Sequence, residues 1–360
     1  MTQSTLPPAF EGPACPLPLP HADQIVIGHG SGGRLTNDLI QQVFLPAFLN
    51  SALLAGNDFA SLNLADLLSS GNTLAVSTDS HIITPLFFPG GDIGRLAVCG
   101  TVNDVSMSGA KPLYLTAGFI LEEGLSIELL QKVVASMAEA AREAGVEIIA
   151  GDTKVVERGK GDGIFITTTG IGLIPAGLHI GGQFAQAGDA VLVSGTLGDH
   201  GIAVLAARGE LGFEADLQSD TAPLNHLIQA ILQAAPHTHV LRDPTRGGLA
   251  TTLNEIAHQS NLGIWLEEEK IPVKPTVRAA CEMLGFDPLY IANEGKVIVI
   301  CPAEEAPLAL MAMRSSPYGA DAEYIGEVRS SSPGRVLLRT PIGGTRVLDV
   351  LAGEILPRIC

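Results

Sequence analysis

The sequence has few aromatic residues and no surplus of basic residues. Of its 360 residues, 4% are aromatic and only one is tryptophan, while 46% are hydrophobic and the formal net charge is −17. Because proteins that bind nucleic acids or anionic membranes need basic residues to neutralise phosphates, this charge balance argues against both kinds of partner. An acidic protein that binds nucleotides would need a cation to neutralise their phosphates.

The sequence also lacks paired cysteines and long apolar runs. Its five cysteines include no Cys-x-x-Cys pair, so neither a disulfide framework nor a zinc site is indicated, and a reducing cytoplasm fits best. No apolar run reaches the roughly 18 residues that a membrane-spanning helix needs. The proline-rich residues 1–23 lack the basic and apolar regions of a signal peptide. We therefore expect a disordered arm there and a protein that is not inserted in a membrane.

Strands and helices are mixed along the chain without strict alternation, which predicts an α+β fold rather than a doubly wound sheet. A chain of this length can form two domains, each with its own core. Glycine turns near residue 180 mark the boundary between them. After the arm, we expect a first domain over 24–180, a second domain over 181–345 and a mobile tail over 346–360.

Two helices of the first domain have clear start and stop signals. Asp92 can cap a helix that closes near Gly109, and Ser126 can cap a longer helix that stops at Gly145. A further helix is predicted over 35–44, with strands at 73–78, 114–121, 147–150 and 163–174. In the second domain, strands are predicted at 190–194, 263–266, 289–291, 296–301 and 321–328. Its predicted helices lie near 200–208, 222–235, 247–259, 276–284 and 304–313.

A glycine-rich segment, Gly28-His-Gly-Ser-Gly-Gly33, matches the Gly-x-Gly-x-x-Gly fingerprint of dinucleotide-binding proteins. That fingerprint also requires a second strand soon after the helix and an acid about 20 residues further on. The first acid at a predicted strand end is Asp79, which is too distant, so an NAD site is disfavoured. A P-loop is excluded because its Gly-x4-Gly-Lys motif is missing. The backbone N–H groups of such a loop still suit phosphate. The candidate phosphate-binding residues are His29, Gly30, Ser31, Gly32 and Gly33.

Three aspartates recur beside glycine, asparagine or serine at predicted strand ends or on the inner face of a helix. They are Asp79, Asp104 and Asp152. A single aspartate in such a place is more often a cap or turn residue. Because Mg²⁺ prefers carboxylate oxygens together with nucleotide phosphates, the three together predict a site for a metal and a nucleotide.

Other candidates lie in the second half of the chain. The segment 243–248 combines an acid, Arg246 and a glycine turn before a helix, which suits phosphate but equally describes a capped helix with a surface arginine. Glu294 lies on a turn between predicted strands, where a hairpin role is common. His200 alone is more commonly structural than catalytic.

Taken together, these segments and the closing Pro357-Arg-Ile-Cys360 resemble the HypE family of hydrogenase maturation proteins. This family belongs to the ATP-binding superfamily of aminoimidazole ribonucleotide synthetase and selenophosphate synthetase. The similarity runs from about residue 24 to Cys360, and the Pro-Arg-Ile-Cys ending separates the family from its superfamily relatives. His81 departs from the family, in which we expect an apolar or aromatic residue. The resemblance implies two mixed α/β domains of the synthetase type, with ATP and Mg²⁺ bound by the N-terminal domain, and a homodimer.

The resemblance also implies a reaction, the ATP-dependent dehydration of a carbamoyl group. A carbamoyltransferase, HypF, would attach this group to the sulfur of Cys360. Phosphorylation of the carboxamide oxygen would turn a poor leaving group into phosphate, and a thiocyanate would remain. Its cyanide would pass to the HypC–HypD scaffold complex for the iron of a [NiFe] hydrogenase.

The residue roles implied by the resemblance follow the motif positions. Lys154 would contact the phosphates or the amide oxygen. Glu294 would accept protons, provided that its carboxyl is ionised, and Cys360 would carry the substrate. Arg246 could stabilise the transferred charge. The implied metal ligands are Asp79, Asp104 and Asp152, and these residues would also contact the nucleotide together with Asn103 and the glycine loop.

Two alternatives remain open from the sequence. One is a kinase or synthetase of the same superfamily that acts on a free small molecule, for which Cys360 would be dispensable. The other is a metal-delivery scaffold in which Cys360 binds iron or nickel directly.

Overall fold

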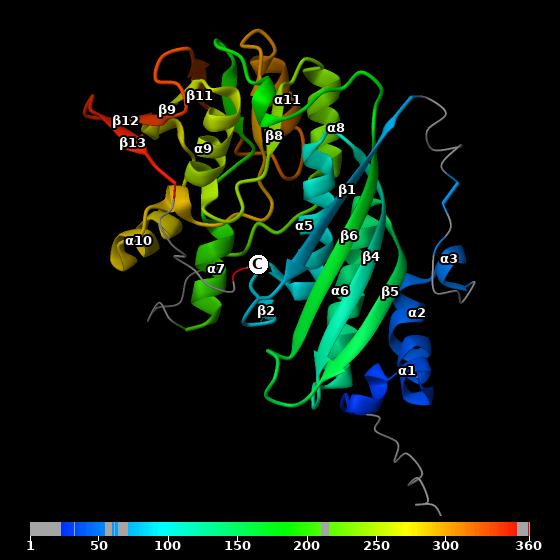
Figure 1. The fold of residues 1–360 in the computed structure, drawn as a ribbon. Helices are drawn as coiled ribbons and strands as arrows, with labels where there is room; N and C mark the ends of the chain where they lie inside the picture. Colours follow the sequence, from blue (N-terminus) through cyan, green and yellow to red (C-terminus); the bar gives the residue numbers. More distant parts are fainter. Residues whose placement is uncertain are drawn as a thin grey trace, which may run out of the picture.

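The computed structural model describes residues 23–31, 33–54, 60, 62–63, 71–209, 216–350 and 359. Among the predicted site residues, Gly32 and Cys360 therefore lie outside the described part of the chain. The described residues form two mixed α/β domains that lie side by side (Figure 1), which confirms the predicted fold class. Within these ranges, no helix is both long enough and apolar enough to cross a membrane.

The first domain is built on a four-stranded sheet with strand order β1-β6-β4-β5. Strands β4 and β5 are parallel, and the other neighbours are antiparallel. Two long helices, α5 and α6, lie behind the sheet as it is drawn in Figure 1. The bounds are β1 (Thr73–His81), β4 (Lys111–Glu122), β5 (Glu147–Val156), β6 (Ile164–Ile174), α5 (Ile93–Met107) and α6 (Ile127–Ala144).

Short elements complete the first domain. They precede the sheet or connect β1 to α5. They are η1 (Ile27–Gly30), α1 (Arg34–Leu39), η2 (Ile40–Phe44), α2 (Leu45–Phe48), α3 (Ser51–Leu54), β2 (Phe87–Phe88) and β3 (Gly91–Asp92). The helix predicted over 35–44 is thus real, although its second half is a π-helix.

The predicted caps of α5 and α6 are confirmed. A carboxylate oxygen of Asp92 accepts hydrogen bonds from the backbone N–H groups of Gly94 at 2.7 Å and Arg95 at 3.2 Å. Ser126 caps α6 in the same way through its hydroxyl oxygen. Gly145 ends α6 with a φ of 69°, a left-handed conformation that glycine adopts without the steric cost of a Cβ.

The second domain is built on a seven-stranded sheet with order β13-β12-β9-β11-β7-β10-β8. Its strands are β7 (Ala190–Val193), β8 (Val240–Arg242), β9 (Gly263–Glu267), β10 (Ile298–Cys301), β11 (Glu323–Arg329), β12 (Val336–Arg339) and β13 (Thr345–Leu348). Its α-helices are α7 (Asp199–Ala207), α8 (Asn225–Ala234), α9 (Gly248–Ser260), α10 (Pro275–Leu284) and α11 (Ala306–Arg314). Three 3-10 helices accompany them, η3 (Gly182–Phe184), η4 (Glu268–Lys270) and η5 (Pro288–Tyr290).

Two sequence predictions for the second domain were wrong. The strand predicted at 289–291 is the 3-10 helix η5, which starts because the Asp287 carboxylate accepts the N–H of Leu289 at 3.0 Å. The strand β13 includes residues 346–348, which were assigned to the tail; β13 pairs with β12, a strand that was not predicted. A short edge strand held by one partner has little hydrophobic signal of its own.

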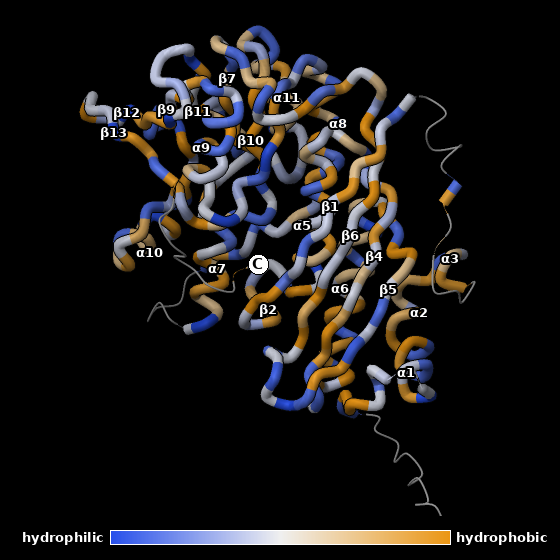
Figure 2. The backbone as a smooth tube through the Cα atoms, in the orientation of Figure 1, coloured by the Kyte–Doolittle hydropathy of each residue, from blue (hydrophilic) through white to orange (hydrophobic). Residues whose placement is uncertain are grey.

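The cores explain how the domains are positioned. Hydrophobic residues follow β4, β6 and the helices behind them, whereas the turn between β5 and β6 is hydrophilic (Figure 2). The core of the first domain continues without a break into α7 and α10 of the second domain. The guanidinium of Arg95 strengthens the junction, because its Nε–H donates to the carbonyl of Thr221 at 3.0 Å and its Nη1 lies 2.8 Å from Glu143.

Candidate active site

Four carboxyl groups from both domains converge at this junction. Asp79 belongs to β1 and Asp104 to α5, whereas Asp243 follows β8 and Glu294 precedes β10. The hydroxyl of Ser77 donates to Asp104 Oδ2 at 2.9 Å. The four carboxyl groups also interact electrostatically, because their negative charges act on one another.

Burial and mutual repulsion raise the pKa values of these acids. Burial first, and then the charge of Asp79, raise the pKa of Asp104. Burial and the charge of Asp104 raise the pKa of Asp243 to about 7. Burial and then the carboxylates of Asp220 and Asp243 raise the pKa of Glu294 well above its ordinary value. The cluster therefore favours protons or a cation, the behaviour expected of a site for a positively charged ligand.

Both backbone polar groups of Glu294 are hydrogen-bonded. Its N–H donates to Asp220 Oδ1 at 3.0 Å, and its carbonyl accepts from Asn103 Nδ2 at 3.1 Å. The side chain is 5% exposed, and its Oε1 has no hydrogen-bond partner among the described residues. Asp220 also pairs with the buried Lys296 at 2.9 Å. The predicted turn thus carries the buried carboxyl group of Glu294 in a fixed position. One of its two oxygens, Oε1, is available to a ligand.

Asn103 has a positioning role that sequence reasoning missed. It is 1% exposed, and its Nδ2 donates to the carbonyls of Ala222 at 3.0 Å and Glu294. Its Oδ1 accepts the N–H of Leu224 at 2.8 Å. Both amide hydrogens of Asn103 are thus used by the backbone, and its contact with a nucleotide stays a prediction. Asn103 ties α5 to the loop that carries Glu294.

His81 and Arg246 flank the acidic cluster. The His81 ring is 1% exposed, and its Nε2 lies 3.8 Å from Asp79 Oδ2 and 3.5 Å from the hydroxyl of Thr168. Burial lowers the pKa of His81, while the charge of Asp79 opposes this change. Arg246 is exposed but close enough to contribute to that lowering, so the structure places its positive charge at the edge of the cluster.

The glycine loop lies at the other side of the first domain, against β5. A Cβ on Gly30 would lie 2.3 Å from the backbone nitrogen of Val155, so only glycine allows this approach. His29 is 4% exposed, and its Nδ1 accepts the N–H of Val26 at 3.0 Å. Ser31 donates to the carbonyl of Gly28 at 2.9 Å. The structure thus joins the predicted loop to the strand that carries Lys154.

Asp152 and Lys154 form an ion pair on β5, with Nζ 2.9 Å from Oδ2. The hydrogen bond from Lys154 lowers the pKa of Asp152. The sequence predicted that the strand ends at Ala150, but β5 continues to Val156, so both side chains stand on one face of a strand instead of a loop. Polar residues in the second half of β5 hid this continuation, because Asp152 and Lys154 are exposed and give no hydrophobic signal.

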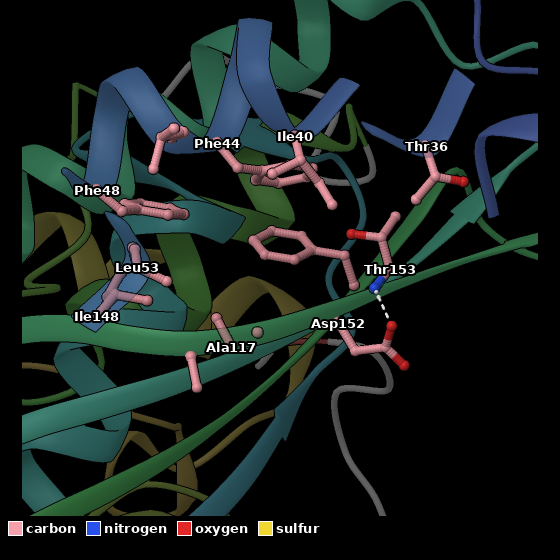
Figure 3. Close-up of a pocket in the computed structure, with 13 residues that line it drawn as sticks. Thr36, Ile40, Phe44, Phe48, Leu53, Ala117, Ile148, Asp152 and Thr153 are labelled. Atoms are coloured by element: carbon pink, nitrogen blue, oxygen red, sulfur yellow. Dashed lines mark hydrogen bonds between the residues drawn. The ribbon is translucent and has the colours of Figure 1, made fainter. Parts of the chain in front are cut away.

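A cavity of about 150 Å³ opens beside this pair, between the short helices and the sheet (Figure 3). Ile40, Phe44 and Phe48 line it from the helices, and Ala117 and Ile148 from the strands, whereas Asp152 points away from it. This apolar lining suits an uncharged group, so charged phosphates would lie outside the cavity. Sequence reasoning missed the cavity because it depends on contacts between segments far apart in the chain.

A single chain does not bring Asp152 to the other two predicted metal ligands. Asp79 pairs with Thr168, and strands β6 and β4 separate it from β5. Three strand spacings amount to about 14 Å. Asp79 faces α5, whereas Asp152 stands on the opposite face of the sheet. In the described part of the chain, no three acidic, histidine or cysteine side chains are placed to hold a metal by themselves.

Near the carboxyl end, Ile359 lies at the domain junction. It forms an isolated antiparallel bridge with Ile83, and its side chain is 3% exposed within the core of the first domain. His200 on α7 contacts the carbonyl of Ile359.

The structure describes three cysteines, and all three are buried. Burial raises the pKa of the Cys99 thiol to about 12.

The two domains correspond to two known family models. The N-terminal domain of AIR synthase related proteins matches residues 56–174, and the C-terminal domain matches residues 186–338. The two domains and the acidic site at their junction therefore define the chain as an AIR synthase related protein.

Relatives narrow this class to one family. The chain is 56% identical over 337 residues to carbamoyl dehydratase HypE of Cupriavidus necator, covering 94% of this chain and 95% of that protein. It is 51% identical over 338 residues to carbamoyl dehydratase HypE of Escherichia coli, covering 94% and 100%. The chain belongs to the HypE family of carbamoyl dehydratases and is an enzyme, which confirms the resemblance.

Solved structures agree. A crystal structure of the hydrogenase maturation protein HypE in complex with ATP superposes with a TM-score of 0.88 at 52% identity, covering 93% of this chain and 99% of that one. A crystal structure of a HypE–HypF complex superposes with a TM-score of 0.75 at 53% identity, covering 87% of this chain and 99% of that one. Thiamine-monophosphate kinase from Stenotrophomonas maltophilia superposes with a TM-score of 0.61 at 20% identity, covering 83% of this chain and 96% of that one. At this identity it shares the fold alone.

Proposed function

We propose that this protein uses ATP to dehydrate a carbamoyl group on the sulfur of Cys360, so that a thiocyanate forms and supplies cyanide for a [NiFe] hydrogenase. The observation that carries the proposal is the burial of Ile359 at the junction that also holds Glu294. Ile359 is bonded directly to Cys360 in the chain. A substrate tethered at this point reacts intramolecularly, which corresponds to an effective molarity of about 10⁵ M or more when alignment is good.

The reaction needs two proton losses and one phosphoryl transfer. The carboxamide oxygen attacks the γ-phosphorus of ATP, releasing ADP, and the nitrogen loses one proton. The second proton then leaves nitrogen while the C–O bond to phosphate breaks, and C≡N and phosphate form. Glu294 is suited to accept a proton because its Oε1 is buried and unpartnered within the described chain. Lys154, exposed on β5, is suited to hold the phosphate or the amide oxygen.

The acidic cluster fits Mg²⁺. Asp79, Asp104 and Asp243 offer hard oxygen ligands, and burial raises the pKa values of the last two although the charge of Arg242 opposes this. When bound, Mg²⁺ would neutralise charge on the triphosphate. Burial and then Asp220 raise the pKa of Glu294 most, and neutralising Asp243, Asp79 and Asp104 would remove the further repulsion that they add, which favours the basic form of Glu294.

We further propose that two copies of the chain form a homodimer through the open face of the first sheet. That face exposes apolar side chains, with Val76 60% and Ile120 42% exposed, beside a ladder of paired hydroxyls that includes Thr78 and Thr169. Asp152 and Lys154 stand on the same face. In such a pair, β5 of one copy would complete the acidic junction of the other.

The partners follow from the chemistry. HypF would donate the carbamoyl group, in line with the solved complex of a related HypE with HypF. The HypC–HypD complex would accept the cyanide. We place the reaction in the cytoplasm, because a carrier thiol must stay reduced between cycles.

Removal of the carrier thiol tests the proposed function. The Cys360→Ala variant should accept no carbamoyl group and show no ATP-dependent loss of water, as measured by intact-mass analysis with ATP, Mg²⁺, carbamoyl phosphate and HypF. The control Cys15→Ala should behave like the wild type. Unchanged ATP turnover on a free small molecule in Cys360→Ala would favour the kinase or synthetase alternative. Iron or nickel retained by the wild type and lost in Cys360→Ser would favour the scaffold.

Two glycines of the first domain provide a matched pair. Gly30→Ala should weaken ATP binding by about 10-fold or more, because its Cβ would press on the backbone of β5 and shift the loop. Gly161→Ala, in the turn between β5 and β6, should bind ATP within about 2-fold of the wild type, since its Cβ would meet no atom closer than 3.4 Å. Isothermal calorimetry would show this difference; equal affinities for both variants would separate the loop from ATP binding.

A further inference from the structure

His200 makes a contact that the reaction described above does not explain. The ring is fully buried near the start of α7, with its Nε2 2.6 Å from the carbonyl oxygen of Ile359 and its Nδ1 2.8 Å from the hydroxyl of Ser219. Its edge packs against the ring of Phe88, with centroids 5.5 Å apart. A buried histidine with polar partners on both nitrogens is fixed in orientation.

The partners also determine where the proton lies. A carbonyl oxygen only accepts hydrogen bonds, so Nε2 of His200 must carry the hydrogen. Nδ1 then accepts the hydroxyl hydrogen of Ser219, whose oxygen is left to accept the N–H of Thr221 at 3.1 Å and its hydroxyl at 2.7 Å. Burial lowers the pKa of His200, although the charge of Asp220 opposes this, and the neutral ring fits the whole network.

This hydrogen bond acts on the peptide group that leads to Cys360. The side chain of Ile359 is held by the core, and its backbone by the bridge to Ile83. The Ile359 carbonyl belongs to the planar peptide unit that joins Ile359 to Cys360. Fixing that oxygen therefore fixes the plane from which the chain continues to Cys360, and among the described residues His200 is the side chain that does so.

The same loop connects His200 to Glu294. Ser219, the partner of His200, is followed directly by Asp220, which accepts the N–H of Glu294 at 3.0 Å. The next residue, Thr221, is tied to α5 through Arg95. The loop over 219–221 thus connects Ile359, through His200, to the backbone of Glu294.

We propose that His200 is a positioning residue that latches the tail, donating its Nε2–H to the Ile359 carbonyl so that a group on Cys360 is presented to Glu294. This inference rests on the proposed function for its chemical consequence, but the latch itself is a property of the unmodified protein. Nε2 of His200 is occupied by the carbonyl, so the ring takes no proton from the substrate.

The test compares His200→Leu, which removes the donor, with His200→Gln, whose amide N–H can replace it. The first readout is the rate at which a carboxypeptidase releases Cys360 from unmodified protein, because cleavage of the Ile359–Cys360 bond requires the Ile359 carbonyl to leave His200. Loss of one buried hydrogen bond should speed release by about 10-fold in the leucine variant, and glutamine should restore it to within about 3-fold. His239→Gln, a partly buried histidine paired with Asp189, is the control and should match the wild type.

The second readout is single-turnover conversion of carbamoylated protein. His200→Leu should slow conversion by about 10-fold or more while the KM for ATP stays within 2-fold, and His200→Gln should recover most of the rate. If the wild type itself fails to convert the adduct, the proposed function is wrong, yet the carboxypeptidase rates still judge the latch. Equal release of Cys360 from His200→Leu and the wild type would overturn the latch.

A third variant protects this test against misfolding of His200→Leu. Ser219→Ala keeps the imidazole but removes the hydroxyl that donates to Nδ1, so the ring can adopt the other tautomer, which cannot donate to Ile359. The rate of Cys360 release should then rise by about 3-fold or more. Two outcomes together would also reject the proposal. Ser219→Ala would show the wild-type rate of release by the carboxypeptidase, and a folded His200→Gln would show the fast release expected of an unlatched tail.

Discussion

Replacing Glu294 with glutamine is expected to leave carbamoylation of Cys360 intact and to slow dehydration by about 100-fold or more. A positioned general base contributes about 10²- to 10⁴-fold, and glutamine fills the same space but accepts no proton. Intact-mass analysis of single turnovers should show that the carbamoyl adduct accumulates in the presence of ATP and Mg²⁺. Conversion at the wild-type rate would show that another group takes the proton.

The same substitution should stabilise the protein without ligands at pH 8. Because the pKa of Glu294 is raised in the folded state by burial and then by Asp220, the folded protein holds a proton that the unfolded chain releases above its ordinary pKa. Stability due to this group is therefore complete at low pH and falls as the pH rises toward the folded pKa. Glutamine does not titrate, so we expect a gain in unfolding free energy at pH 8 that vanishes near pH 4.

Glu143→Gln is the control of opposite sign. Burial alone would raise the pKa of Glu143, but hydrogen bonds from Arg95 and Tyr318 lower it overall. A group with a lowered pKa stabilises the fold above its ordinary pKa and loses this effect as the pH falls. Glu143→Gln should therefore be less stable than the wild type at pH 8. Urea unfolding of both variants at pH 4 and pH 8 measures the contrast, and changes of equal sign would refute the assignment for Glu294.

The sequence predicted best what depends on neighbours in the chain. Asp92 and Ser126 cap their helices, and Gly145 ends one, because each acts on N–H groups or dihedral angles within a few residues. The two domains and the glycine loop follow from similar local patterns and from the family resemblance. By contrast, the end of β5 was misplaced, since nothing local to Asp152 shows that the partner strand continues beside it.

The arrangement of the site depended on contacts that no local pattern reveals. Asn103 was predicted only to contact a nucleotide, and no local pattern showed that its amide holds the loop of Glu294. Asp243 was noticed only as part of a phosphate-binding pattern, whereas its position beside Asp104 makes it a candidate metal ligand. His200, judged structural from the sequence, contacts Ile359 across 159 positions of the chain. Such pairs become visible only when both segments are placed in space.

A mixture of two inactive variants should regain activity if the site is shared between copies. Asp79→Asn and Asp152→Asn should each lose most dehydration activity, because each removes one part of every site. In a heterodimer, one site receives both changes and the other receives none, since Asp79 comes from one copy and Asp152 from the other. Random pairing makes half of the dimers mixed, so co-expression should restore about a quarter of the wild-type rate.

The matched control combines Asp79→Asn with Asp104→Asn. Both residues belong to the acidic junction of the same chain, so each copy in a mixed dimer carries one damaged junction and no intact site forms. Single-turnover dehydration by the co-purified, differently tagged dimers distinguishes the two mixtures. Recovery in the control, or its absence with Asp79→Asn and Asp152→Asn, would mean that β5 does not complete the junction of another copy. Lys154, which is paired with Asp152 on the same face, would then have to act from a site separate from Glu294.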